Sequence, residues 1–335
     1  MPAKQTETPI LIPFLWLTAM GILAIFAYNE YEQSYILENV GALLFALPVI
    51  TFWGFLFLRA NWKENFFMCV LWTLILVAAP IYAYHYYTHQ IPENFPPKAG
   101  LRVATYNVNY FNGSEESVNA RLNVIKQLNA DVISVVEGNT MWSLHLGTLK
   151  DTYPYSFTAP EQPNRGTIGR VILMSKYPIL ESTLLNAGHI VHHKIQLAPE
   201  QIFNIVQVHA MPPLNRALVE QRSATFDALE TELPADNLMI MGDFNSVPWQ
   251  NDIQHLVQTH NLIKASGIKP TWPAVMPVAP IDHILVSKPA YSVDSKRLCF
   301  QGSDHCLVYT DVINYLKNVE KTPPAPKAKE AKAKK

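Results

Sequence analysis

The most informative stretch of the sequence is Leu238-Met-Ile-Met-Gly-Asp243-Phe-Asn245-Ser-Val-Pro-Trp249. It begins as a short apolar run and ends in turn-forming residues, which predicts a buried strand followed by a loop. Gly242 allows a bend at low steric cost. Asp243 and Asn245 are two residues apart, so in extended geometry their side chains point to the same side. The stretch predicts a carboxylate and an amide together at a strand end, although an ordinary turn would use the same residues.

The same pattern recurs along the chain, because many of the predicted strands end in a polar residue. Strands are predicted at residues 101–106, 131–136, 169–175, 181–186, 190–197, 201–208, 238–241, 281–286, 292–300 and 306–312, and helices at 114–128, 139–149, 214–233 and 249–259. The polar residues at strand ends are Asn107, Glu137, His209, Asp243 with Asn245, Asp282, and Asp304 with His305. One such residue is usually a cap or a turn, but a series in phase predicts a single site at one end of packed strands.

The polar residues at these strand ends are of types that can bind a metal ion or a phosphate. Carboxylate and amide oxygens suit Mg²⁺ or Mn²⁺ rather than zinc. Hydrolysis of a phosphate ester places negative charge on the phosphate and leaving-group oxygens, where a cation and imidazolium donors help.

The segments resemble the endonuclease/exonuclease/phosphatase superfamily, whose fold is that of deoxyribonuclease I. The matching motifs lie within residues 100–315: Thr105-Tyr-Asn107-Val, Asp131-Val-Ile-Ser-Val-Val-Glu137, Val208-His209 before Pro-Pro, Gly242-Asp243-Phe-Asn245, Ile281-Asp282-His283 and Gly302-Ser-Asp304-His305. The resemblance implies an α/β fold, a four-layered α/β sandwich of two packed, mostly antiparallel sheets with flanking helices. It also implies hydrolysis of phosphate esters with Mg²⁺ or Mn²⁺. The segments Asn245-Ser-Val-Pro-Trp249 and Thr271-Trp-Pro resemble the bacterial, membrane-anchored branch.

The resemblance also implies roles for the strand-end residues. Glu137 would be the main metal ligand, with Asn107 and Asp304 nearby.

The remaining strand-end residues would be catalytic. Asp243 would hold or deprotonate the attacking water, and Asn245 would orient Asp243 or the phosphate. His305 would contact the phosphate and pair with Asp282, and His209 would donate to a phosphate oxygen or to the leaving group.

Several further residues have two interpretations. Arg165 is a candidate for phosphate contact and fits a solvated loop equally well. Trp249, like Trp272, is a candidate for stacking on substrate, but Trp beside Pro also packs beneath loops. The histidines at positions 189, 192 and 193 lack neighbouring ligands, so exposed strand ends are expected rather than a metal site.

The N-terminal region, residues 1–88, predicts a membrane domain. Residues 10–28, 40–58 and 66–87 are apolar runs long enough to cross a bilayer as helices. Arg59 and Lys63 in the second loop place that loop in the cytoplasm, so the domain at 101–316 is expected outside the cytoplasmic (inner) membrane, on the periplasmic side in a Gram-negative cell. Residues 89–100 form a Pro-rich linker, and residues 317–335 a disordered Lys/Pro/Ala-rich tail.

The composition gives the chain as a whole almost no net charge, so no overall field favours nucleic acid or anionic lipid. It has 335 residues, 49% hydrophobic and 16% charged, with a formal net charge of -1. The expected partners are the lipid bilayer and a phosphate-ester substrate (nucleic acid, lipid headgroup or small phosphoester), with no obligate protein partner. The alternative is an inactive binding or scaffold module of the same fold. Cys299 and Cys306 could form a disulfide if the domain faces an oxidising compartment.

Overall fold

The structure is a computed structural model that describes residues 91–92, 94–160, 169–234, 236–274, 277–299 and 302–313. The three predicted membrane segments, Arg165 and the C-terminal tail lie outside these residues. Within them, no helix is both long and apolar enough to cross a bilayer.

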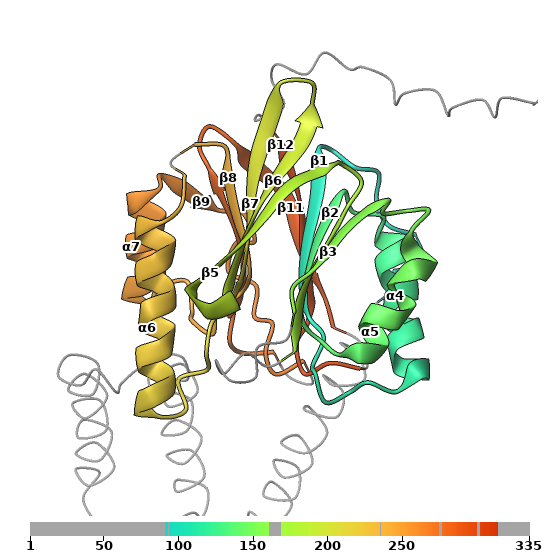
Figure 1. Ribbon diagram of the computed structural model, residues 1–335, viewed down its shortest axis with the longest axis horizontal. Helices are drawn as coiled ribbons and strands as arrows, with labels where there is room; N and C mark the ends of the chain where they lie inside the picture. The colour runs from blue at the N-terminus through green and yellow to red at the C-terminus, as the bar shows by residue number, and fades with distance from the viewer. Residues whose placement is uncertain are drawn as a thin grey trace, which may run out of the picture.

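Two six-stranded sheets form the centre of the domain (Figure 1). The first has the order β11-β12-β1-β2-β4-β3, with bounds Tyr291–Leu298, Leu307–Ile313, Leu101–Asn107, Val132–Gly138, Arg170–Ser175 and Tyr155–Thr158. The second has the order β5-β6-β7-β8-β10-β9, with bounds Ile179–Leu185, Ile190–Ala198, Gln201–His209, Leu238–Asp243, Asp282–Ser287 and Leu262–Lys264.

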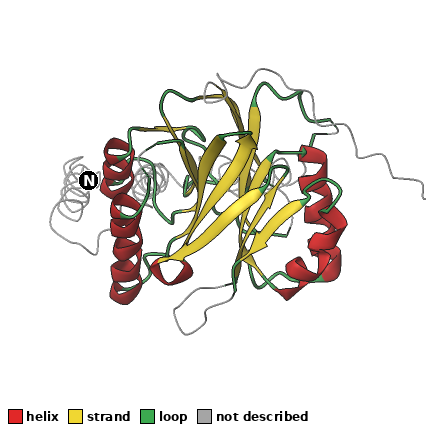
Figure 2. Ribbon diagram, turned by 45° about the horizontal axis from the view of Figure 1, so that its top comes forward, coloured by secondary structure: helices red, strands yellow, loops and turns green. Residues whose placement is uncertain are grey.

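Helices cover the outer face of each sheet. The described helices are α4 (Glu115–Leu128), α5 (Thr140–His145), α6 (Arg216–Thr231) and α7 (Asn251–Thr259), with short 3₁₀ turns at Leu146–Leu149 and Asn186–Gly188. The side chains of Ser114, Asn139 and Asn215 cap the first three by accepting backbone N–H bonds. In Figures 1 and 2, α4 and α5 lie outside the first sheet, whereas α6 and α7 lie outside the second.

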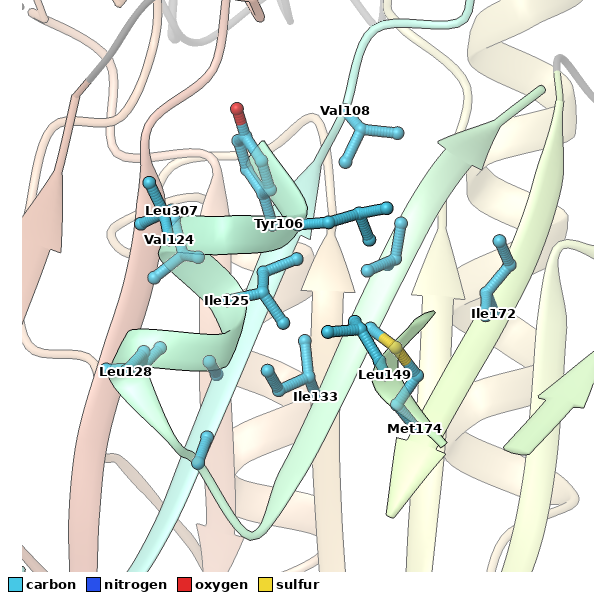
Figure 3. Packing of buried hydrophobic residues seen from close by; sticks show 14 of the residues in the cluster. Tyr106, Val108, Val124, Ile125, Leu128, Ile133, Leu149, Ile172, Met174 and Leu307 are labelled. Atoms are coloured by element: carbon cyan, nitrogen blue, oxygen red, sulfur yellow. The ribbon is translucent and has the colours of Figure 1, made fainter. Parts of the chain in front are cut away.

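Three apolar layers hold the sheets and helices together. Ile125 and Leu128 of α4 pack on Ile133 and Tyr106 of the first sheet (Figure 3). A second cluster, which includes Val103, lies between the sheets, and a third packs α6 and α7 on the second sheet. The predicted α/β sandwich with flanking helices is therefore confirmed, and each of its sheets is mixed.

The topology explains why the polar strand ends meet. Each sheet contains one parallel pair, β1 with β2 and β7 with β8, while the other pairs are antiparallel. Helix α4 connects the first parallel pair and α6 the second, so the two strands of each pair end at the same end of their sheet. A hydrogen bond from Asn107, which ends β1, to Asp243, which ends β8, shows that both pairs end at the same end of the sandwich. Asp282, which begins the antiparallel strand β10, lies directly opposite Asp243. We call this the catalytic end; it is the lower end in Figure 1.

Two expectations about polar residues were wrong. His189 and His193 are buried, not exposed. The ring of His193 is hydrogen-bonded to Ser182 at 2.8 Å and to Gln207 at 3.0 Å, which compensates for its loss of water. Burial lowers the pKa of His193 to about 4, so the ring is neutral at pH 7.

Cys299 and Cys306 form a disulfide, the possibility that the sequence left open. The bridge connects the end of β11 to the start of β12, two strands that pair side by side. It therefore fastens the segment between them, which contains Asp304 and His305, beside the catalytic end.

Candidate active site

Asn107 connects the two halves of the candidate site. It ends β1 and is buried. Its Nδ2 donates to Oε1 of Glu137 at 2.9 Å and to Oδ2 of Asp243 at 3.1 Å. Glu137 belongs to the first sheet and Asp243 to the second, so one amide bridges a carboxylate from each.

The backbone directs Glu137 into the site. A β-bulge interrupts the pairing of β2 with β4 between Val135 and Gly138, and Glu137 has a positive φ of 60°. Such a conformation is strained for a glutamate and is typical of functional positions. Gly169 lies close by, where an added Cβ would be 2.7 Å from the Glu137 Cα.

Glu137 is held as a carboxylate by three donors. Besides Asn107, the backbone N–H of Tyr110 donates to its Oε2 at 3.1 Å, and Nε2 of His209 lies 3.3 Å from its Oε1. Burial alone would raise the pKa of Glu137, but the bonds from His209, Asn107 and Tyr110 outweigh burial and lower it to about 2. In return, Glu137 raises the pKa of His209 against the effect of burial.

Asp243 ends β8 in a more crowded electrostatic environment. Asn245 donates its backbone N–H to Oδ1 of Asp243 at 2.8 Å and its Nδ2 to Oδ2 at 3.3 Å. The same Nδ2 donates to the carbonyl oxygen of Ala210 at 2.9 Å, which fixes the amide. Burial and the nearby Asp282 raise the pKa of Asp243 to about 6, although His305 acts in the opposite direction.

His305 is the second imidazole of the site. Its Nδ1 is 2.9 Å from Oδ2 of Asp282, and its Nε2 is 3.7 Å from Oδ2 of Asp243. Burial would lower the pKa of His305, but Asp282 and Asp243 raise it to about 10. The pairing of His305 with Asp282 thus keeps the ring protonated, and the ring contacts the carboxylate expected to hold water.

Asp304 lies at the more exposed edge of the site. Its Oδ1 accepts from Nδ2 of Asn109 at 3.0 Å, and its Oδ2 accepts from Nε1 of Trp272 at 3.2 Å. Neither of these two partners of Asp304 was predicted from the sequence. Asn109 follows Asn107 by two residues, as Asn245 follows Asp243, and this repeated spacing is the signal in the sequence that identifies Asn109 as a site residue. For Trp272 the sequence left open whether the ring stacks on substrate or packs beneath a loop. Its hydrogen bond to Asp304, 32 positions away, could not be read from the local pattern.

A second layer of contacts holds the loop after β8. Arg222, fully buried on α6, donates from its Nη1 to the carbonyl oxygen of Asn245 at 3.0 Å and to Oγ of Ser246 at 2.9 Å. The ring of His283 is 2.7 Å from the carbonyl oxygen of Ser246. These contacts position Asn245 from behind.

The site opens into a cleft of about 370 Å³ with two unlike walls. The polar wall consists of Glu137, His209, Asp243, Asn245, Asp304 and His305, and the apolar wall of Met211, Pro212, Pro213, Leu214, Trp272, Ala279 and Ile281. Trp249 is half-exposed and does not line this cleft, so its predicted substrate contact stays a prediction.

The donor set fits a hard divalent cation. Oδ1 of Asp282 is buried without a hydrogen-bond partner among the described residues, an acceptor that a cation would satisfy. Asp243, Asp282 and His305 have ligand atoms within 4.8 Å of one another, a second candidate set beside the predicted Glu137 set, in which His305 could bind a cation only as the neutral ring. Asn107 directs its NH₂ group, rather than its amide oxygen, toward Glu137. Its predicted role as a metal ligand therefore stays a prediction.

The fold and these paired carboxylates and imidazoles define a class of hydrolases that cleave phosphate esters. Residues 104–305 match the Endonuclease/Exonuclease/phosphatase family, more than half of the chain. The chain belongs to this family and is a hydrolase that acts on phosphoester bonds.

Solved structures share the fold at low sequence identity. A functionally unknown conserved protein from Enterococcus faecalis V583 has a TM-score of 0.51 and 16% identity, covering 64% of this chain and 99% of its own. A humanized TDP2 from D. rerio has a TM-score of 0.50 and 15% identity over the same shares. D. rerio TDP2 complexed with a single-strand DNA product has a TM-score of 0.50 and 14% identity, covering 64% of this chain and 100% of its own. A search of curated proteins finds no match.

Proposed function

We propose that the chain is a membrane-anchored, divalent-metal-dependent phosphoesterase or phosphodiesterase that uses water as the nucleophile. One observation carries the proposal: the amide of Asn107 joins Glu137 and Asp243, two carboxylates from different sheets that line the same cleft. Caps and turns would satisfy local backbone groups and would not converge from two sheets.

Glu137, with Asn107 and Asp304 nearby, would hold Mg²⁺ or Mn²⁺. When bound, the ion would stabilise negative charge on the phosphate oxygens as the ester bond breaks.

The chain's own residues supply orientation and protons. Asp243 holds the attacking water and accepts its proton, and Asn245 fixes the Asp243 carboxylate through two hydrogen bonds. His305, held by Asp282, donates to a phosphate oxygen. His209 lies beside Glu137 on the cleft wall and donates to a phosphate or leaving-group oxygen.

The anchor and the location belong to the same proposal. Residues 10–28, 40–58 and 66–87 would cross the cytoplasmic membrane, with the catalytic domain on its outer side. The disulfide between Cys299 and Cys306 supports an outer location, because such bonds persist in oxidising compartments. Protease added to intact spheroplasts should digest the domain, whereas protection until the membrane is opened would contradict this location.

The activity test compares the wild-type chain with Glu137→Gln, which keeps the size of the side chain and removes its charge. Wild type should hydrolyse bis(p-nitrophenyl) phosphate with Mg²⁺ or Mn²⁺ and lose activity in EDTA, and Glu137→Gln should lose at least about a hundredfold. The matched control is Glu181→Gln, an exposed surface residue paired with Lys194. Equal activity of wild type with and without EDTA, or of both variants, would refute the proposal.

A further inference from the structure

Exposed apolar side chains occur on the loops at the catalytic end and on the neighbouring helix α5. They are Phe111, Leu144, Leu214, Trp249, Ile268 and Trp272, and we call them the apolar rim. Phe111 is 83% exposed and Leu214 is 70% exposed. Leu214 and Trp272 also line the cleft, so the rim continues into its apolar wall. Large apolar groups exposed around a site mark a surface that binds something apolar.

The first described residues of the chain also lie at the catalytic end. Ala99 is near the opposite end, where its backbone N–H donates to Asp311 of β12. From there the chain runs back along the first sheet, with Phe95 packed edge-on against Tyr309. Pro92 then lines a surface groove together with residues 269, 270 and 277. The same groove is lined by Leu298, which ends β11 and pairs with Leu307 just after His305, so the groove lies beside the catalytic end.

That entry point places the catalytic end next to the bilayer. The third predicted membrane segment ends at residue 87, five residues before Pro92. Five residues span at most about 18 Å even when fully extended. A domain tethered so closely at its catalytic end turns that end, and its apolar rim, toward the membrane. The groove beside the tether contributes Lys269, whose charge suits anionic headgroups.

We infer that the apolar rim docks on the bilayer and that the substrate is a phospholipid of that same membrane. The inference rests on the proposed function and names its substrate class. The lipid phosphate would meet the polar wall, while Met211, Leu214 and Ile281 would contact the apolar part of the lipid. Water oxygen bonds to phosphorus, one ester P–O bond breaks, and the departing alcohol oxygen takes up a proton. The products are a phosphomonoester and an alcohol.

The composition of the cleft favours a lipid over a nucleic acid. A nucleic-acid strand is bound through basic residues that follow its phosphates. Of the described residues that line the cleft, none is Lys or Arg, and more than half are apolar. A single phosphate beside an apolar chain fits these walls better than a polyanion.

The test uses the full chain reconstituted in vesicles of phosphatidylethanolamine and phosphatidylglycerol with Mn²⁺. The rim variant is Phe111→Ser with Ile268→Ser, two exposed residues outside the cleft lining. The matched control is Leu180→Ser with Ile202→Ser, also exposed but at the opposite end, where β5 and β7 begin. Release of lipid products is measured beside hydrolysis of bis(p-nitrophenyl) phosphate and of a single-stranded DNA oligonucleotide.

We expect wild type and the control pair to cleave vesicle lipid, and the rim pair to lose at least about tenfold of that activity, because two apolar side chains no longer enter the bilayer. Hydrolysis of bis(p-nitrophenyl) phosphate should be unchanged in both pairs. Lipid cleavage by the rim pair at the wild-type rate would overturn the docking surface. If wild type cleaves the soluble ester or the oligonucleotide but not lipid, the substrate class is wrong and the proposed function stands. If wild type cleaves nothing, the proposed function itself fails.

Discussion

Gly242 offers a sharp test of how the backbone positions the site. It precedes Asp243 in β8, has a φ of +151°, and an added Cβ would lie 1.9 Å from the carbonyl oxygen of Val208. Val208 is the partner of Gly242 in the parallel strand pair, so the added Cβ would overlap the backbone of a paired strand, which cannot rotate away as a side chain could. We therefore expect Gly242→Ala to destabilise the domain.

The magnitude follows from two contributions. The positive φ costs a residue with a side chain about 1–3 kcal/mol. Forcing an extra carbon into a packed interior costs about another 1–3 kcal/mol. The sum of about 2–6 kcal/mol corresponds to a fall in Tm of about 5–20 °C for a domain of this size.

Two other glycines separate the contributions. Gly267 has a φ of +62° with no atom within 4 Å of an added Cβ, and Gly147 has neither a positive φ nor a neighbour within that distance. Gly267→Ala should therefore lower Tm by about 2–10 °C from backbone strain alone, and Gly147→Ala by less than about 2 °C. Melting of the full chain in detergent, followed by tryptophan fluorescence, measures all three. Equal melting of Gly242→Ala and Gly267→Ala would show that the contact with Val208 does not exist.

Three further outcomes follow from the structure. Asp282→Asn should reduce kcat on bis(p-nitrophenyl) phosphate by about a hundredfold or more, because His305 loses the carboxylate that orients and charges it. The control Asp227→Asn, on the exposed face of α6, should leave kcat unchanged. Equal kcat values for the two variants would show that His305 takes no part in the reaction. The pKa of His193 is about 4 in the folded state and 6.5 in the unfolded chain, so the unfolded state binds more protons below pH 6.5. The contribution of His193 to the free energy of unfolding should therefore be fully present above pH 6.5 and fall by about 3 kcal/mol as the pH drops to 4. Comparing acid unfolding of the wild type with that of His193→Gln checks this, and identical pH dependence would contradict it. A maleimide should label one cysteine in the unfolded, unreduced chain and three after reduction, and three before reduction would rule out the bridge between Cys299 and Cys306.

The sequence predicted most elements because their signals are local. β8 shows as a short apolar run and the helix α4 as an apolar period, and their ends carry turn or capping residues. The strands β3 and β9 were not predicted because they have only four and three residues, too few for a period to be read. The sheet order could not be predicted either, since it depends on pairings between distant strands.

Distant pairing also explains the wrong expectation for His193. Burying an imidazole requires partners, and its ring finds Ser182 on β5 and Gln207 on β7. Gln207 continues the network by donating to Oγ of Ser134 on β2 in the other sheet, at 2.8 Å. No pattern around residue 193 indicates those partners, so a polar residue in a strand is assigned to the surface by default.

The two carboxylates that Asn107 joins have opposite environments, although similar motifs produce them. Glu137 and Asp243 each end the second strand of a parallel β-α-β unit. Glu137 is surrounded by donors, including His209, and its pKa falls to about 2. Burial, together with the nearby Asp282, raises the pKa of Asp243 to about 6. A group with a very low pKa suits charge-based binding of a cation, whereas one that titrates near neutrality suits exchange of a proton with water. Since His209 and Asp282 come from the second sheet and Glu137 from the first, this division of roles requires both sheets. It arises from tertiary packing rather than from either strand-end motif alone.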